Sequence, residues 1–428
     1  MRPKHTILLI FLIFAYTTGA YAQEVNVQRV LYTSFSDDKV LRYAEMERFS
    51  RTLNYNLPAI KKVELKLGIN GNNNPDTLDG SLRNEDYYAV NISPNKWKEM
   101  KLQKEVKPTQ TNLYTREMEM QQMQALLERY QLVVNLYFTL ELLKNKTDLQ
   151  DLLNKKNTLL QKMLNEGITV KINDALDIDR DLVQLYGLLL EDEKSASIYK
   201  ARLKQYLNTS QALNINFSDI ISVRKIIENS LTLRQDSLDI HPALNYKEAQ
   251  YLLAKANYKL ELSQNTNILE YVQLGYNRPV YSPEILKKFK PENTLTFRVG
   301  ISVPITGNYN LNRNNANLQQ YNALLNWQSA QTIQNNSIRI QEMRLSEDIK
   351  HYNALVEINK KSIVNKLLEN KDVMAQSTAL EIIDLKIARK KLEISLINSS
   401  QTVMQSYILL LESKGLLKYD IRQKYLLE

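Results

Sequence analysis

The sequence predicts a mainly α-helical protein, in which long antiparallel coiled-coil hairpins accompany a small β part of two β-hairpins. The 428-residue chain contains only ten Gly and ten Pro, too few for a compact domain with many short elements. Two pairs of short segments alternate apolar and polar residues, as strands do. A heptad seam, typical of coiled coils, is formed by Leu126, Tyr130, Val133, Tyr137 and Leu140.

The composition excludes several kinds of site. Without cysteine, the chain has no disulfides, thiolate metal sites, cysteine nucleophile or lipidated cysteine. The net charge is +9, but basic residues are scattered among acidic ones, which favours a solvated helix surface over a nucleic-acid site. No nucleophile elbow, phosphate-binding loop or metal-ligand spacing is present, so we expect neither an enzyme nor a cofactor. We expect structural roles for His241 and His351.

The amino-terminal segment has the pattern of a secretory signal peptide. A basic head at Met1–His5 precedes the apolar run Ile7–Tyr16, and Ala20–Ala22 before Gln23 matches a cleavage site. The apolar run is too short to span a bilayer, and no later stretch approaches eighteen apolar residues. We therefore expect residues 1–22 to be removed and predict no transmembrane helix.

The first repeat is predicted over residues 23–207. A helical segment to about residue 58 precedes a β-hairpin, 63–93, whose strands, 63–69 and 87–93, flank an Asn- and Gly-rich loop. A long helical hairpin follows. Its first helix runs from Pro94 to about Asn165, reverses at Glu166-Gly167 and returns to about Leu207.

The second repeat has the same order over residues 241–412. An inter-repeat segment, 208–240, includes a candidate strand at 214–217 and separates the two halves. The second repeat comprises a helix opened by Pro242, a β-hairpin (268–304), a helix from about 309 to 370, a turn at 371–377 and a helix from 378 to 412. We expect the tail, 413–428, to fray. A repeat of this length indicates duplication rather than a solenoid.

One detail of the duplication is inconsistent. Aligning Pro94 with Pro304 places Val90 opposite Gly300, and Ile92 opposite Ser302, which inverts the faces of the strand. Strand 87–93 is therefore either shifted by one residue or carries a β-bulge.

Several short motifs, in this order and in two copies, resemble the TolC-like outer-membrane efflux family. Gly300–Gly307 is similar to that family's passage from strand to long helix. His241–Leu244 followed by Ala254–Lys259 is similar to the helix before its second hairpin. Asn165–Ile168 with the later Asp177-Ile178 is similar to its first periplasmic reversal. The resemblance covers essentially the whole chain after the signal peptide.

The resemblance implies a homotrimer. Each chain would give four strands to one 12-stranded transmembrane β-barrel, and the long helices would continue as an α-barrel tunnel through the periplasm. Elementary physics agrees, because two hairpins cannot close alone and an open edge cannot lie in lipid. The implied location is the outer membrane of a Gram-negative bacterium. The sequence departs from the family pattern in two places. The second reversal, Asn370–Ser377, lacks Gly. Gln23, not cysteine, follows the cleavage site, so no lipid anchor is implied.

The resemblance also implies an acidic constriction at the periplasmic tip. The matching residues are Glu381 and Asp384, which share one helix face at i, i+3. Asp177 has the equivalent place in the first repeat. Three copies would bring six carboxylates of Glu381 and Asp384 around one opening, where they would attract cations. The alternative is that these are ordinary solvated positions.

A second set of candidates lies on the strands. The polar face should line the barrel lumen and its apolar counterpart should face lipid. The lumen candidates are Glu64, Lys66, Thr296, Arg298 and Ser302. Tyrosines 87, 88, 271 and 276 are candidates for an aromatic belt. The alternative is a soluble sheet with one wet face.

Three functions remain open from the sequence. The first is a passive outer-membrane exit duct of a tripartite efflux pump, with a periplasmic adaptor meeting the helical tips at 166–178 and 371–384 and an inner-membrane transporter supplying the energy. The second is the outer-membrane duct of a type I protein secretion system. The third is a periplasmic coiled-coil scaffold without a pore.

Overall fold

The computed structural model describes residues 23–32, 38–53, 58–72, 83–209, 213–233, 241–264, 269–280, 293–301, 307–417 and 425–427. The chain divides into two units. The first comprises Met1–Arg42, Met118–Pro242 and Thr332–Glu428, and the second comprises Tyr43–Glu117 and Ala243–Gln331. Each unit thus draws on both predicted repeats.

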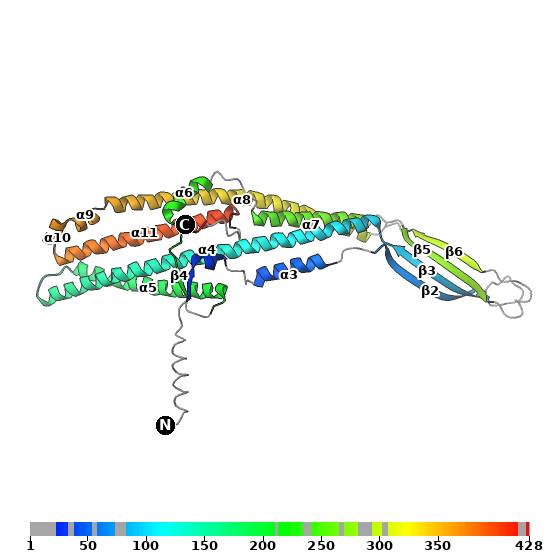
Figure 1. Cartoon of the computed structure of the whole chain (residues 1–428), viewed down its shortest axis with the longest axis horizontal. Helices are drawn as coiled ribbons and strands as arrows, with labels where there is room; N and C mark the ends of the chain where they lie inside the picture. The colour runs from blue at the N-terminus through cyan, green and yellow to red at the C-terminus, as the bar shows by residue number, and fades with distance from the viewer. Residues whose placement is uncertain are drawn as a thin grey trace, which may run out of the picture. The chain divides into compact units, whose positions relative to one another are not determined.

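Helices and strands follow one another in nearly the predicted order (Figure 1). The elements are β1 (Gln23–Asn26), α2 (Val27–Tyr32), α3 (Asp38–Thr52), β2 (Ile60–Asn72), β3 (Arg83–Pro94), α4 (Trp97–Asn165), α5 (Ile172–Leu207), β4 (Leu213–Asn216), α6 (Val223–Leu233), α7 (Pro242–Gln264), β5 (Leu269–Val280), β6 (Thr294–Ile301), α8 (Gly307–Lys361), α9 (Ile363–Glu369), α10 (Lys371–Gln376) and α11 (Ala379–Ser413). None of the described helices is both long and apolar enough to cross a membrane.

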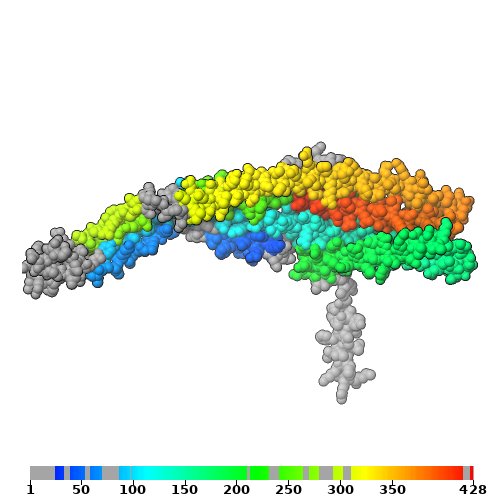
Figure 2. Space-filling view, turned by 180° about the vertical axis from the view of Figure 1, so that it is seen from behind, coloured from blue at the N-terminus to red at the C-terminus, as the bar shows by residue number. Residues whose placement is uncertain are grey.

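The first unit is a set of long helices packed along their apolar seams. Figure 2 shows α11, in red and orange, lying along α8 on one side, with the green α5 on its other side. The predicted seam of α4 forms the centre of the core: Leu126 and Val133 are almost completely buried, and they share a cluster with Tyr407 and Leu411 of α11. Heptad spacing therefore identified the buried face of α4 correctly.

The amino-terminal and carboxy-terminal segments of the first unit differ from expectation. Residues 23–26 form a strand, not a helix, and β1 pairs in parallel with β4, Gln23 opposite Leu213. The tail does not fray where it is described. Leu426 is fully buried, and its carbonyl oxygen accepts a 2.9 Å hydrogen bond from Ile221 N. Both errors concern pairing between distant segments, which local periodicity does not encode.

The tip of the second helical hairpin also differs. The sequence predicted one helix to about residue 370, but α8 ends at Lys361, because Ser362, with φ −58° and ψ 123°, leaves the helical conformation. The side-chain amide of Asn365 donates to the Asn359 carbonyl oxygen, at 2.9 Å, and so supplies a partner at the break. The predicted turn at 371–377 contains the short helix α10, whose first amides are capped by the side chain of Asn370. Asn370 itself has extended backbone, with φ −83° and ψ 107°, so the chain leaves α9 there without a left-handed residue and no glycine is needed.

The second unit contains a four-stranded antiparallel sheet of order β2-β3-β5-β6 (Figure 1). The two predicted hairpins meet through β3 and β5, so that β2 and β6 form the two edges. Leu65 lies opposite Val90, Val90 opposite Leu274, and Leu274 opposite Phe297. Because side chains of paired residues share a face, the apolar positions of all four strands lie on one side of the sheet.

The register explains the mismatch found in strand 87–93. Val90 lies opposite Leu65, on the apolar face, and the pairing of β3 with β2 is continuous over this strand. The register shifts lie instead after Ile60 in β2 and after Leu269 in β5. The strand is therefore displaced by one residue relative to the proline that follows it, and it carries no bulge of its own.

Candidate functional site

The first helical tip places Asp177 on the surface of α5. Gly167, with φ +74°, allows the chain to turn after α4, and Ile168 N donates to the Met163 carbonyl oxygen at 2.8 Å. Asp177 accepts a 2.8 Å ion-paired hydrogen bond from Arg180, three residues later, and both side chains are exposed. The carboxylate is thus partly neutralised by its own helix.

Glu381 takes part in the cap at the amino terminus of α11. The backbone N–H of Thr378 donates to Glu381 Oε2 at 2.8 Å, and the Thr378 hydroxyl accepts from the Glu381 N–H at 3.3 Å. This reciprocal capping box satisfies amides that the first helical turn cannot pair internally. Hydrogen bonds from the Thr378 backbone and hydroxyl lower the pKa of the exposed Glu381 carboxyl below its ordinary value. The side chain therefore has a structural partner and is also charged and accessible.

Asp384 connects the two helical hairpins. Its carboxylate lies 2.7 Å from Lys156 Nζ of α4, while farther along α11 the ammonium of Lys391 lies 2.7 Å from Asp181 of α5. Glu381 and Asp384 are on the same first stretch of α11, as predicted, but they have different surroundings: a helix cap for one and a lysine for the other.

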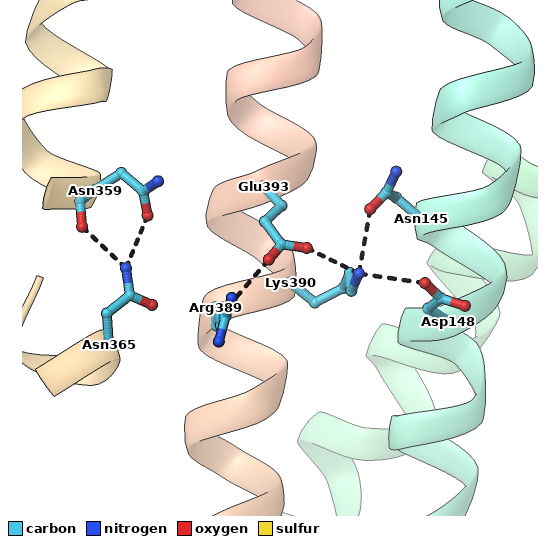
Figure 3. A network of polar contacts seen from close by, with 7 residues as sticks. All are labelled: Asn145, Asp148, Asn359, Asn365, Arg389, Lys390 and Glu393. Atoms are coloured by element: carbon cyan, nitrogen blue, oxygen red, sulfur yellow. Dashed lines mark hydrogen bonds and ion pairs between the residues drawn. The ribbon is translucent and has the colours of Figure 1, made fainter. Parts of the chain in front are cut away.

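A further polar network holds α11 against α4, and the sequence analysis missed it (Figure 3). Lys390 Nζ donates to Asn145 Oδ1 and Asp148 Oδ2, both at 3.2 Å, and lies 2.8 Å from Glu393 Oε2. Partial burial by itself would lower the pKa of Lys390, but hydrogen bonds to Glu393 and Asp148 outweigh that effect and raise it. Arg389 also contacts Glu393, at 3.2 Å. No local spacing signals this site, because Lys390 and Asp148 are 242 residues apart.

The apolar face of the sheet in the second unit is exposed. Leu65 is 76% exposed and Phe297 is 65% exposed, at the two ends of a row that crosses the sheet. The other large apolar residues that are exposed on the four strands are Ile60, Val63, Leu67, Ile69, Tyr88, Leu269, Leu274, Tyr276, Leu295, Val299 and Ile301. In water, so much adjoining apolar surface marks a region that contacts another apolar phase or molecule.

The polar face contains most of the predicted lumen residues. Glu64 and Arg298 lie in one row with Asn91 and Gln273 between them, and Asn91 donates to Glu64 at 3.2 Å. In the next row, Lys66 is opposite Ala89, and Thr296 is opposite Gly275. On the inner strands Asn91 and Gln273 are 6% and 4% exposed, whereas Lys66 and Arg298 on the edge strands are exposed. Ser302, the fifth candidate, lies outside the described residues.

The four tyrosines proposed as a belt divide between the two faces. Tyr88 and Tyr276 are paired with each other in the apolar row, where a belt residue belongs. Tyr87 and Tyr271, in contrast, alternate onto the polar face, where Tyr87 accepts a hydrogen bond from Gln273. The belt prediction for Tyr87 and Tyr271 was wrong, because adjacent residues of a strand point to opposite faces.

The described residues contain no group of three or more His, Cys, Asp or Glu side chains that could hold a metal ion. Of the two histidines that the structure describes, His351 is exposed on α8, with its Nδ1 3.2 Å from Ser399 Oγ, and His241, just before α7, is 5% exposed near Glu412. The candidate functional features are therefore the charged residues at the tips of the long helices and the apolar face of the sheet.

No family model and no curated protein matches the chain. Solved structures do match over nearly the whole length. The open state of the outer-membrane channel MtrE of Neisseria gonorrhoeae has a TM-score of 0.61 at 13% identity, covering 93% of this chain and 90% of that one.

The chain has a TolC-like fold.

Two further solved structures support this assignment. The outer-membrane channel CmeC of Campylobacter jejuni gives a TM-score of 0.58 at 13% identity, covering 91% of this chain and 84% of that one. The outer-membrane protein VceC of Vibrio cholerae gives 0.59 at 9% identity, covering 91% and 95%. The TolC-like resemblance predicted from short motifs is thus confirmed at the level of the fold.

Proposed function

We propose that three copies of this chain form the passive outer-membrane exit duct of a tripartite efflux pump. Each copy contributes β2, β3, β5 and β6 to a 12-stranded transmembrane barrel, and the long helices form a tunnel in the periplasm. A periplasmic adaptor docks at the helical tips, and an inner-membrane transporter supplies the energy. The similarity in fold to MtrE, CmeC and VceC, which are described as outer-membrane channels or proteins, supports this proposal.

The observation that carries the proposal is the inversion of the sheet. A soluble sheet buries its apolar face and exposes its polar one. Here Leu274 of the inner strand β5 is 55% exposed, whereas its neighbour Gln273, on the opposite face, is 4% exposed. At about 25 cal/mol per Å² of apolar surface, leaving such a face in water is costly, whereas lipid would cover it without loss. The polar face then belongs to an aqueous interior.

The order of the strands favours closure by further copies. The sheet ends in β2 on one side and β6 on the other, and its four strands alternate in direction. β6 of one copy can therefore pair antiparallel with β2 of the next. Unpaired backbone groups are strongly disfavoured in hydrocarbon, so a sheet that enters lipid has to close on itself.

At the other end of the path, we propose that Glu381 and Asp384 face the tunnel mouth, with Asp177 near it. Three copies would concentrate negative charge there and retard anions while binding cations. The hydrogen bonds of Glu381 keep its carboxyl ionised to lower pH than an ordinary glutamate. We assign the chain no catalytic step. Small molecules are the preferred cargo, and a secreted protein is the competing one.

The experiment that tests the proposal is fractionation followed by single-channel recording. We expect the full chain in outer-membrane fractions as a heat-resistant trimer that gives discrete conductance steps in planar bilayers. A water-soluble monomer without conductance would overturn the duct and favour a periplasmic scaffold. Deleting the gene then separates the cargoes: sensitivity to small toxic compounds indicates efflux, and loss of one exported protein indicates secretion.

A further inference from the structure

Two tyrosine rings on the polar face of the sheet occupy positions that glycines leave empty. The first is Tyr271 of β5, which lies opposite Gly300 of β6. A Cβ atom added to Gly300 would lie 2.6 Å from Tyr271 Cδ1 and 2.7 Å from Cζ, much closer than a van der Waals contact. The ring therefore lies on the strand beside it, directly over the glycine backbone. Gly300 is needed here for space, since its φ is not in the left-handed region.

The second ring, Tyr87 of β3, lies between two glycines. A Cβ on Gly275 would lie 3.3 Å from Tyr87 Cε2 and 2.5 Å from Thr296 Oγ1, whereas a Cβ on Gly68 would lie 4.0 Å from Tyr87 Cδ1. The Tyr87 hydroxyl accepts a hydrogen bond from the amide of Gln273. Since Asn277 is the residue opposite Tyr87, a ring whose hydroxyl reaches Gln273 has to lean along β5, across Gly275.

These contacts hold both rings against the sheet. A glycine inside a strand normally weakens it, and an aromatic ring laid over it from the next strand restores the lost packing. The same contacts also keep the two tyrosine rings flat against the sheet. A tyrosine on the polar face would otherwise stand away from the sheet, as strand side chains usually do.

We propose that Tyr87 and Tyr271 line the bore of the duct and that Gly275 and Gly300 set its width by letting these rings lie flat. This inference rests on the proposed function, because the polar face must enclose the transport path. Three copies would then present six phenol rings to the cargo. Ring faces offer contact to aromatic and cationic groups without a deep site, which suits a passage for planar or positively charged compounds.

The test is the conductance of glycine variants in planar bilayers. In Gly300→Ala the new Cβ collides with the Tyr271 ring, so the ring must rotate into the bore, and we expect lower single-channel conductance. Gly68→Ala is the matched control: it is also a strand glycine beside a tyrosine, but its Cβ makes an ordinary 4.0 Å contact, and conductance should not change.

A double variant separates a blocked bore from a damaged barrel. Gly300→Ala/Tyr271→Ala lacks the ring and should recover the conductance of Tyr271→Ala alone, together with its yield of heat-resistant trimer. A double variant as impaired as Gly300→Ala, or a Gly300→Ala channel that conducts like the wild type, would overturn the inference. If Gly300→Ala forms no trimer, recovery of trimers in the double variant supports the ring collision, and failure to recover contradicts it. A wild-type protein that does not conduct would instead refute the duct itself.

Discussion

Lys390 of α11 donates from Nζ to Asp148 Oδ2 of α4 over 3.2 Å, and thereby joins the returning helix of the second hairpin to the outgoing helix of the first. Asn145 and Glu393 complete the surroundings of the same ammonium. The Lys390 side chain is 20% exposed and that of Asp148 is 52% exposed, so the lysine end of this pair is the one shielded from solvent.

Replacing Lys390 by Met should loosen the two hairpins. Methionine keeps an unbranched apolar stem but removes the donor to Asp148 and Asn145, so we expect a loss of about 1 kcal/mol in the free energy of unfolding. Chemical denaturation of the purified protein, followed by helical circular dichroism, measures it. Lys350→Met is the control. In the part of the chain that the structure describes, Lys350 pairs with Glu347, on its own helix, and both are exposed, so a loss of about 0.3 kcal/mol is expected. Equal losses would contradict a special role for Lys390.

The capping box predicts a pH dependence at the start of α11. The folded-state pKa of Glu381 is lowered from 4.5, so the stability it contributes is complete above that value and is lost as pH falls through the lower folded pKa. The backbone amide that donates to the Glu381 carboxylate is that of Thr378, so hydrogen exchange at the Thr378 amide should gain speed below pH 4.5, relative to a peptide standard. Glu381→Gln, which can still form a capping box, should abolish this dependence. A dependence that survives in Glu381→Gln would assign it to another group.

The proposed mouth predicts a charge effect on ion flow. Glu381→Gln/Asp384→Asn retains the shapes of both side chains while removing their charges. We expect larger conductance and weaker block by divalent cations, because fewer carboxylates hold cations in the opening. Single-channel recording with and without Mg²⁺ measures both quantities. Glu347→Gln removes an exposed carboxylate of α8 and should leave both unchanged. Unaltered recordings from the double variant would remove the mouth assignment and leave the duct intact.

The exposed apolar face predicts where a new charge is tolerated. Leu65→Arg places a cation on the face assigned to lipid and should cost about 2–4 kcal/mol near the bilayer centre, so that trimer yield in outer-membrane fractions falls. Thr296→Arg adds the same group to the polar face and should leave yield nearly unchanged. If the sheet were in water instead, Leu65→Arg would leave the yield nearly unchanged, because the Leu65 side chain is already 76% exposed.

The parts of the fold that the sequence could predict are those determined by short repeats of apolar residues along one helix or strand. The heptad of Leu126 and Val133 identified the buried seam of α4, and alternation along β2 and β6 separated Leu65 from Glu64 and Phe297 from Arg298. These patterns depend on the geometry of one element at a time.

What sequence could not predict depends on encounters between distant segments. The break at Ser362 is accompanied by a hydrogen bond from Asn365, and β1 exists because residues near position 213 pair with it. The contacts of Lys390 and the overlap of Tyr271 with Gly300 likewise require the register of separate elements. Asp384 was found from a motif, but Lys156, which neutralises it, was not.

The interleaving of the two units limits how this protein can be dissected. The chain passes from one unit to the other at residues 42–43, 117–118, 242–243 and 331–332, so each unit is assembled from separate stretches of the gene. A deletion that removes one hairpin takes strands from the sheet and helices from the bundle together. Truncated variants therefore cannot assign a role to either unit, and single substitutions in the full-length chain are needed instead.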